Sequence, residues 1–248
     1  MNLIHINALN ELQKKETSAL AEACKAKEPL ALSAPSEDGL DYFLLYEKDQ
    51  SGLLGFAFLF FPQETACECA VFVHPDHRRR GYCLRILDSV LEYVEEYEKK
   101  NQLAVDFCFL TDEKTPSAMA VMENLEAEYW YSEYKMVRPL KEKDRVYTPQ
   151  LQIRQDEAGL YTAVLNDTII GTCSILPSGQ EFYLYAFQIK EEYQGQGYGK
   201  DFLSGMLAIL AAEGGTVSLQ VSGQNYIARN LYKKTGFKTT ESLSYYIY

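Results

Sequence analysis

The sequence has no long apolar run and no excess of basic charge. Its longest apolar run, Leu53 to Phe61, is well short of the roughly 20 residues that a membrane-spanning helix needs, so we expect no membrane partner. The first residues lack the basic and apolar regions of a signal peptide, which favours a cytoplasmic location. The net charge of −11 argues against nucleic acid as a partner.

Histidine and cysteine are not spaced for metal binding. The chain has three histidines and six cysteines, and Cys67-x-Cys69 has no second cysteine pair. The nearest histidines, His74 and His77, do not complete a zinc pattern, so we expect no metal. Most of the cysteines lie in apolar surroundings, where a reduced cysteine packs as a small hydrophobe, and this agrees with a reducing cytoplasm.

An internal repeat is the main feature that the sequence does contain. Residues 53–58 match residues 169–174, and residues 71–83 match residues 187–199. Both matches have the same offset of 116 residues. Chance apolar similarity would not keep one register over so long a segment, so the repeat indicates two related domains.

We expect the two domains to cover residues 1–140 and 141–248. Their junction lies between Pro139 and Pro149, in a charged segment flanked by proline, as is typical of a linker. The charge is uneven, with a net of −10 in the first domain and −1 in the second. An acidic first domain favours a cationic acceptor slightly, although such a face also serves solubility alone.

Apolar periodicity predicts the elements of both halves. In the first half we expect strands near residues 3–6, 40–47, 53–61, 67–73, 103–110 and 128–137, with helices near 8–27, 83–101 and 116–125. In the second half we expect strands near 151–154, 160–165, 169–176, 182–189, 216–221 and 243–248, with helices near 199–213 and 225–235. The second half leaves no room before residue 160 for a helical region like that of residues 8–27.

A glycine loop joins the strand at residues 182–189 to the following helix. Its pattern is Gln194-x-x-Gly197-x-Gly199, with Ile189 ending the strand five positions before the glutamine. Glycine lets the backbone approach a ligand closely, and the amides at a helix start are unpaired. The loop therefore predicts a site for an anion such as a pyrophosphate.

A second motif follows this loop. Asn225 precedes a helix on which Ala228, Leu231 and Tyr232 share one face, and Gly236-Phe237 ends it. In this order the two motifs resemble the acetyl-CoA motifs of the GNAT superfamily of N-acetyltransferases. The resemblance covers nearly all of the second half and, through the repeat, much of the first.

The resemblance implies an α/β (α+β) fold, with two tandem domains that each have a mixed, mostly antiparallel sheet flanked by helices. It implies acetyl-CoA as co-substrate, and transfer of an acetyl group to a primary amine of a small molecule or peptide by direct attack in a ternary complex. It assigns catalysis to the second domain. The first domain is then a degenerate copy with a structural or substrate-shaping role.

The resemblance also implies roles for individual residues. Tyr232 matches the general acid that protonates the leaving thiolate, and the Ile189 amide is the expected donor to the thioester carbonyl. A phenol has a reference pKa of about 10, against about 8.5 for a thiol, so it stays protonated at neutral pH. The cofactor-binding residues are expected to be Phe187, Gln188, Ile189, Gln194, Gly195, Gln196, Gly197, Tyr198, Gly199, Lys200, Asn225 and Tyr232.

The general base is not identified. Many family members have a glutamate at the position of Tyr185, and a tyrosine there favours a role in shaping the substrate site. By strand alternation Tyr183 points the same way, and Glu181 lies near the strand start. A carboxylate from the first domain or a water relay could replace the missing base.

The first copy departs further from the pattern. Arg78-Arg79-Arg80-Gly81 keeps the leading residue and the first glycine, but Cys83 stands where glycine or alanine is usual, and Met122 falls near the tyrosine position. A methionine cannot donate a proton. The arginines either bind a phosphate of coenzyme A or form a solvated loop. We interpret His74-Pro75 as a strand end.

Three functions stay open at this point. One is the N-acetyltransferase, and a second is a non-catalytic protein that binds acyl-CoA or regulates another. The third is an enzyme with a longer acyl or an aminoacyl donor. The acceptor is a polyamine, an aminoglycoside, an amino acid or a peptide N-terminus, and the chain is either a monomer or a homodimer.

Overall fold

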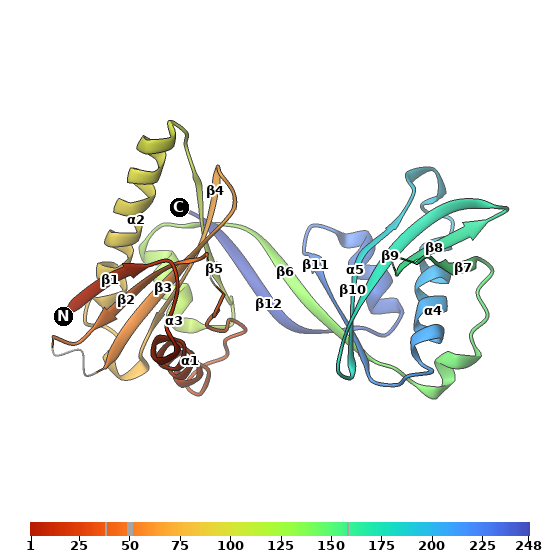
Figure 1. The fold of residues 1–248 in the computed structure, drawn as a ribbon, viewed down its shortest axis with the longest axis horizontal. Coiled ribbons are helices and arrows are strands. Elements are labelled where there is room, and N and C mark those ends of the chain that lie inside the picture. Colours follow the sequence, from red (N-terminus) through yellow and green to blue (C-terminus); the bar gives the residue numbers. More distant parts are fainter. Residues whose placement is uncertain (38, 49–51, 158) are drawn as a thin grey trace. The chain divides into compact units, whose positions relative to one another are not determined.

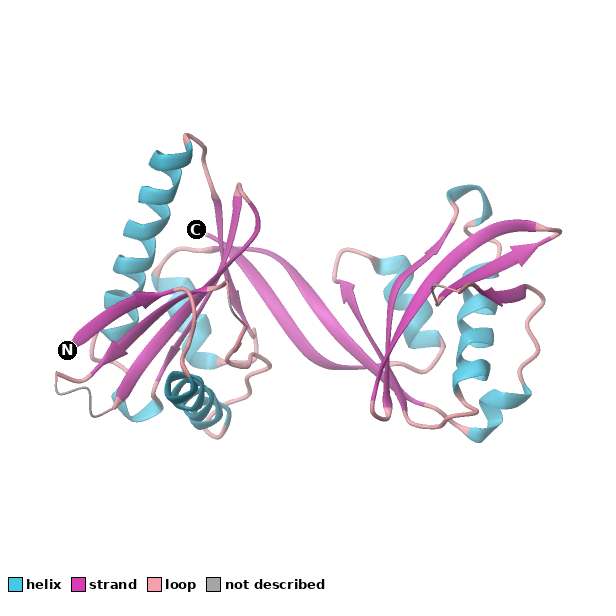
Figure 2. Cartoon of the chain, in the orientation of Figure 1, coloured by secondary structure: helices cyan, strands magenta, loops and turns pink. Residues whose placement is uncertain are grey.

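The computed structural model describes residues 1–37, 39–48, 52–157 and 159–248. The chain divides into two compact units, which Figures 1 and 2 show as ribbons. The first unit comprises Met1–Ser132 together with Leu243–Tyr248, and the second comprises Glu133–Ser242. Both are sheets with helices, so the expected α/β class with mostly antiparallel strands is confirmed.

The first unit has helices on both faces of its sheet. Its strands follow the order β1-β2-β3-β4-β5-β12, in which only β4 and β5 pair in parallel. Its elements are β1 (Asn2–Ile6), α1 (Glu11–Lys25), β2 (Asp41–Tyr46), β3 (Leu53–Gln63), β4 (Ala66–Val73), the 3₁₀ turn η1 (Pro75–His77), α2 (Tyr82–Asn101), β5 (Asp106–Thr111) and α3 (Pro116–Asn124).

Two cores account for this layering. Tyr42 and Leu44 of β2 pack with Leu20 of α1, whereas the alternate residues Phe43 and Leu45 belong to a core with α2 and α3. Side chains of a strand alternate between the two faces. Because both faces are buried, β2 is apolar at nearly every position.

In the described residues of the second unit, both α-helices pack on the same face of the sheet. Its strands follow the order β6-β11-β10-β9-β8-β7, in which β10 and β11 pair in parallel. Its elements are β6 (Glu128–Pro139), which begins in the first unit, η2 (Glu142–Val146), β7 (Gln152–Gln155), β8 (Leu160–Leu165), β9 (Thr168–Ser178), β10 (Glu181–Ile189), η3 (Glu191–Tyr193), α4 (Tyr198–Leu210), β11 (Thr216–Ser222) and α5 (Tyr226–Lys234). As expected, the part that the structure describes has no helix between β7 and β8.

The closing strands are exchanged between the two copies. Residues 133–139 of β6 pair with β11, from Glu133 opposite Ser222 to Pro139 opposite Thr216. The last strand, β12 (Lys238–Ile247), starts earlier than expected, and its end pairs with β5 of the first unit. The compact units therefore divide the chain differently from the repeat boundary at residue 140, because each closing strand completes the sheet of the other copy.

The charged junction segment is built into the second unit. Arg138 donates two hydrogen bonds to the Asp144 carboxylate, at 2.9 and 2.7 Å. Arg145 donates to the Ala211 carbonyl at the end of α4, at 2.8 Å. The charged residues of the predicted linker therefore make hydrogen bonds within the second unit, one of them to the end of α4.

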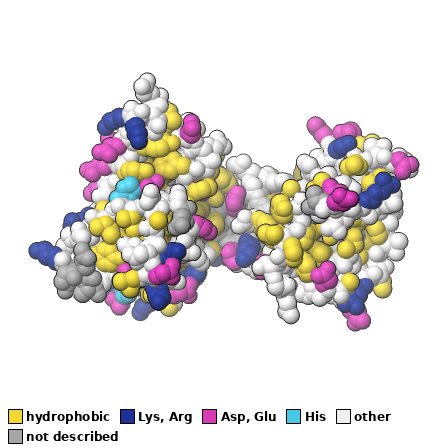
Figure 3. Space-filling model, in the orientation of Figure 1, with side chains coloured by type: hydrophobic (Ala, Val, Ile, Leu, Met, Phe, Trp, Pro, Cys, Tyr) yellow, Lys and Arg dark blue, Asp and Glu magenta, His cyan; other side chains and the backbone are white. Residues whose placement is uncertain are grey.

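Charged side chains of both signs are distributed over the surface. Figure 3 shows acidic and basic side chains interspersed on the visible faces of both units. The described residues include no helix that is both long and apolar enough to cross a membrane.

Candidate functional site

The loop after β10 has a backbone that leaves amides open. Gly195 and Gly197 have φ values of 73° and 90°, a left-handed region that side chains disfavour. Gly197 caps α4 without a side-chain hydrogen bond to the first amides of that helix. The Gln194 side chain donates to the Ile189 carbonyl at 2.8 Å, which ties the loop to the strand end. Open amides and the helix dipole together favour an anion here.

A bulge interrupts β10 just before this loop. Tyr185 lies opposite Ser174, but Gln188 lies opposite Thr172, so two residues of β10 face one residue of β9. Ala186, within the bulge, has a φ of 50°. Such a conformation is costly for a non-glycine residue, and it often marks a functional site.

Strands β10 and β11 separate at the same level. Their parallel pairing stops at Tyr183 opposite Ser218. A cavity of about 250 Å³ occupies the space between the strands beyond this pair. Its lining comes from β10, β11 and α5, and consists of Leu184, Tyr185, Ala186, Phe187, Gln220, Val221, Ser222, Asn225, Ala228 and Tyr232.

The backbone of Ile189 points away from β9. The Lys190 amide donates to the Ile170 carbonyl at 2.8 Å, so Lys190 belongs to a hydrogen-bonded position of the ladder. Ile189, paired with Gly171, is then a position whose amide and carbonyl face the opposite side, as the bond from Gln194 to its carbonyl shows. The Ile189 amide is therefore turned to the side on which β11 has separated.

Tyr232 is the only titratable residue that α5 contributes to the cavity lining of the described chain. It is 6% exposed, and its ring lies against those of Phe187 and Phe237, with centroids 6.4 and 5.7 Å away. Burial, with a smaller contribution from Cys173, raises the pKa of Tyr232 to about 12. The phenol is therefore a proton donor at every physiological pH.

Asn225 occupies the cap of α5, as the sequence predicts. Its side-chain oxygen accepts from the Ala228 amide at 3.0 Å. The oxygen is therefore engaged, and the amino group is the part of the side chain that can reach a ligand in the cavity.

Other expected cofactor residues lie outside this cavity. The Gln188 side chain donates to the Thr172 hydroxyl of β9 at 2.9 Å. Lys200, in the first turn of α4, lines a second cavity of about 240 Å³ with Lys143 and Lys234. Arg138 and Asp144 also line it, but they neutralise each other as an ion pair at 2.7 Å. The three lysines leave this cavity positively charged.

The expected base position carries an aromatic pair. Tyr185 is 46% exposed and stacks on Tyr183, with ring centroids 6.0 Å apart and planes 13° apart. The Tyr183 hydroxyl donates to the Gln220 side-chain oxygen at 3.2 Å. Glu181 lies two residues earlier, where β10 still pairs with both neighbouring strands.

One carboxylate near the cavity escapes prediction from the sequence. Glu133 falls in the first domain of the repeat, but the structure places it on β6 in the second unit, directly opposite Ser222 of the cavity lining. Only the pairing of β6 with β11 shows this, and no local pattern around Glu133 indicates it.

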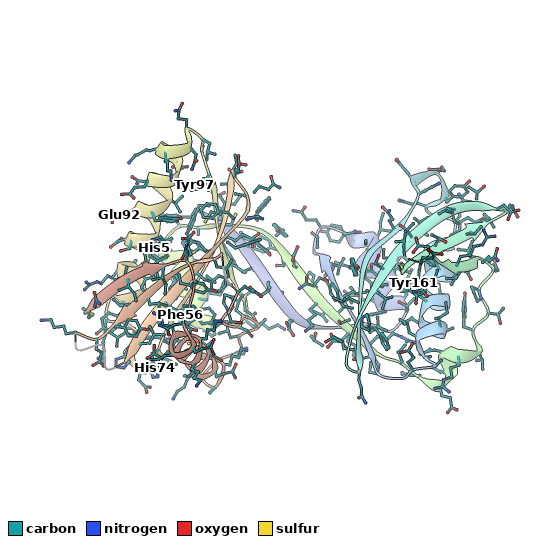
Figure 4. All side chains as sticks on the ribbon, in the orientation of Figure 1. His5, Phe56, His74, Glu92, Tyr97 and Tyr161 are labelled. Atoms are coloured by element: carbon teal, nitrogen blue, oxygen red, sulfur yellow. The ribbon has the colours of Figure 1, made fainter. Side chains whose placement is uncertain are left out.

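The loop of the first unit repeats the same backbone. Arg79 and Gly81 have φ values of 61° and 79°, and the Arg78 side chain donates to the Val73 carbonyl at 3.3 Å. His74, labelled in Figure 4, follows the end of β4, as expected of a strand end. Arg79 therefore adopts a conformation that suits glycine, at a cost of roughly 1–2 kcal/mol.

Residues 28–31 lie against the loop and the start of α3 in the first unit. The Glu28 carboxylate bonds Arg78 of the loop and both the amide and the hydroxyl of Ser117 in the first turn of α3. The Ala31 amide donates to Asp112 at 2.9 Å, just beyond β5. In addition, β4 has no bulge opposite β3 near the loop, and Met122 is buried in the core.

This carboxylate is strongly held. Burial alone would raise the pKa of Glu28, but hydrogen bonds from Ser117 and the positive charge of Arg78 outweigh it and lower the pKa. In the first unit, the Glu28 carboxylate thus supplies the negative charge that bonds both Arg78 of the loop and the Ser117 amide at the start of α3.

The chain is similar to known acetyltransferases in both sequence and fold. The sequence model described as the acetyltransferase (GNAT) family matches residues 6–111 and again residues 119–237. An uncharacterized N-acetyltransferase, YycN of Bacillus subtilis (strain 168), is 38% identical over 63 residues, which are 25% of this chain and 40% of that relative.

Two solved structures cover almost the whole chain. One is a GCN5-related N-acetyltransferase from Sphaerobacter thermophilus, with a TM-score of 0.80, 15% identity, and coverage of 99% of this chain and 95% of the other. The second is a tandem GNAT protein from the clavulanic acid biosynthesis pathway, with a TM-score of 0.71, 12% identity, and coverage of 100% and 98%. At such identities the likeness shows the fold alone. Together with the two family matches, it shows that the chain belongs to the acetyltransferase (GNAT) family of acyltransferases, with two copies of the family fold in tandem.

Proposed function

We propose that the second unit transfers an acetyl group from acetyl-CoA to a primary amine of a small molecule or peptide, by direct attack in a ternary complex. The observation that carries this proposal is the cavity between β10 and β11, which has a buried tyrosine in its wall and a bulged strand along one side. The cavity has both polar and apolar lining residues, as suits the arm that carries a thioester.

The loop and α4 would hold the phosphates of the cofactor. The amides of residues 195–199 lie at the start of α4, where an anion is favoured, whereas the Lys200 amide already donates to the Gly197 carbonyl at 3.0 Å. The positively charged cavity beside Lys200 adds attraction for the phosphate-rich end of the molecule. The Asn225 amino group and the backbone of residues 187–189 would bond the pantetheine arm.

The chemistry needs a polarised carbonyl and a protonated leaving group. The Ile189 amide, turned to the open side of β10, would donate to the carbonyl oxygen as negative charge develops there. Tyr232, with its pKa raised to about 12, would give its proton to the sulfur as the carbon–sulfur bond breaks. We assign the first unit a structural role, because Glu28 bonds Arg78 of its loop and the Ala31 amide bonds Asp112 beyond β5.

A direct experiment measures release of the free coenzyme A thiol. Purified protein is mixed with acetyl-CoA and a set of primary amines that includes polyamines, aminoglycosides, amino acids and peptides. We expect amine-dependent thiol release for at least one class, with mass spectrometry detecting an acetylated amine. Binding of acetyl-CoA without transfer to any of these amines would contradict the proposal.

That contrary result would support the alternative, a protein that binds acyl-CoA without catalysis. The feature that favours the alternative is Tyr185, which stands exposed where a basic carboxylate is expected. The buried Tyr232 in the cavity wall favours the enzyme, because a binding protein has no use for a proton donor at that point.

A further inference from the structure

The face of the second unit opposite α4 and α5 is polar around the cavity. On β11, Val217, Leu219 and Val221 are buried with the helices, so the alternate residues Gln220 and Ser222 point to the other face. Tyr183 of β10 lies on this face too, because its hydroxyl bonds the Gln220 side chain. We call this surface the polar face.

The register of β6 places Glu133 on the polar face. Glu133 lies directly opposite Ser222, and Lys135 lies opposite Gln220. Residues directly opposite in an antiparallel pair share a face, with Cβ atoms about 5 Å apart. Since Ser222 and Gln220 both line the cavity between β10 and β11, Glu133 stands one strand away from its lining.

The carboxylate of Glu133 has no ion-pair partner among the described residues, and the residue is half-buried. Among the residues that the structure describes, no salt bridge or side-chain hydrogen bond engages it, whereas Glu241 of β12 pairs with Lys135 at 3.2 Å. Burial raises the pKa of Glu133. Tyr183 and Lys135 are charged or titratable groups on the same face. Burial, with a smaller contribution from Glu133, raises the pKa of Tyr183, and Lys135 acts in the opposite direction.

We propose that Glu133 is the base that takes a proton from the acceptor's ammonium group on the polar face. This assignment rests on the proposed function and names the acceptor side of the same site. The exposed face of Tyr185 would lie against the cation before deprotonation, as aromatic rings do with ammonium groups.

The proton balance is complete with the residues present. Glu133 takes one proton from the ammonium and later releases it to solvent, which leaves a neutral amine. The nitrogen lone pair forms the new bond to the carbonyl carbon, and the electrons of the carbon–sulfur bond leave with the sulfur. Tyr232 gives that sulfur a proton, and the second proton lost by the nitrogen restores the Tyr232 phenol through solvent.

The test compares Glu133→Gln with Glu241→Gln, a change in an acidic residue of β12 that the cavity lining does not include. With the best amine from the thiol-release experiment, Glu133→Gln should lower kcat/KM at pH 7 by about 10²–10⁴-fold, and Glu241→Gln should leave it within twofold. The wild-type rate should fall at acid pH with a pKa above the usual glutamate value of about 4.3. The deficit of the Glu133→Gln variant should shrink near pH 10, where the amine is already neutral.

A carbon NMR titration of the wild-type carboxylates supplies a readout independent of turnover. The resonance that disappears in Glu133→Gln should titrate above the usual glutamate pKa, and an ordinary or lowered value overturns the assignment. Wild-type kcat/KM in Glu133→Gln at every pH overturns the assignment while leaving the transferase intact. A wild-type protein that acetylates none of the amines overturns the proposed function and the assignment together.

Discussion

The loops of the two units share a backbone but differ in what surrounds them. Arg78 and Gln194 have φ/ψ values of −65°/163° and −72°/162°, and each side chain bonds the carbonyl that ends the preceding strand. In the second unit this loop follows a bulged strand and an open cavity. In the first unit the strand is regular there, and Glu28 bonds the loop.

The same loop backbone therefore occurs both with and without a neighbouring bulge and cavity. The loop shape is maintained by local hydrogen bonds, and these survive in both copies. The second unit differs in three features: the bulge at Ala186, Tyr232 in the cavity wall, and a start of α4 that has no side-chain cap.

The largest expected effect comes from Tyr232→Phe. Loss of the proton donor should lower kcat by about 10²–10⁴-fold, while acetyl-CoA affinity changes less than threefold, because the ring still fills its place. Steady-state kinetics and calorimetry measure the two quantities. Tyr161→Phe, in a tyrosine of β8 labelled in Figure 4 that packs on the same core outside the cavity, is the control. Equal losses in both variants would indicate a packing effect.

A smaller effect, on stability, is expected from Glu28→Gln. Removing the negative charge leaves Arg78 without its ion pair and should lower the free energy of unfolding by about 1–3 kcal/mol, as measured by urea denaturation. Glu22→Gln breaks an exposed pair with Lys25 and should cost less than about 1 kcal/mol.

The same carboxylate predicts a pH dependence. The pKa of Glu28 is lowered in the folded state, so its contribution to stability is present above the unfolded pKa, about 4.5, and is lost as the pH falls through the folded pKa. The stability difference between wild type and Glu28→Gln should therefore narrow below pH 4.5. A difference that stays constant down to pH 3 would show that Glu28 does not titrate as proposed.

A matched pair of glycine substitutions tests which of the two loops contributes to acetyl-CoA binding. Gly197→Ala and Gly81→Ala place a side chain at φ values of 90° and 79°, where an added Cβ meets no atom within 4 Å. Both should lose about 1 kcal/mol of stability through backbone strain. Only Gly197→Ala should weaken acetyl-CoA binding, by about tenfold. Weaker binding in Gly81→Ala would place a ligand in the first unit.

For the number of acetyl-CoA molecules bound per chain, we expect Glu28→Gln to have no effect. Titration calorimetry of the wild type should show one acetyl-CoA per chain, and Glu28→Gln should keep that value, because β4 still lacks the bulge and Met122 still occupies the tyrosine position. A second binding event in Glu28→Gln would show that the internal carboxylate alone closes the first unit.

Much of the fold follows from local sequence patterns. The expected strand at residues 160–165 matches β8, and the expected helix at 225–235 matches α5 within one residue at each end. Apolar period and the caps at Asn225 and Gly236 fix these elements without long-range information. The roles of Tyr232 and the loop residues stay predictions, although the structure places Tyr232, Asn225 and Phe187 around one cavity.

Local sequence patterns do not predict which strands pair when the strands are far apart in the sequence. The strands at residues 128–137 and 243–248 both alternate, and either could have closed either sheet. Glu133 and the segment around Glu28 acquire their positions only through partners far away in the sequence, at Ser222 and Ser117. Register is set by the assembled sheet, so these features emerge only in three dimensions.

Because the closing strands are exchanged, the first sheet cannot be completed until the end of the chain has been synthesised. β5 finds its neighbour in residues 244–247, more than 130 positions later. While the ribosome is still making the second half, the first sheet is one strand short, with an open edge that invites pairing with other chains. Each compact unit thus contains a strand from the other repeat, and we expect neither half to be a stable protein when the gene is cut at the repeat boundary.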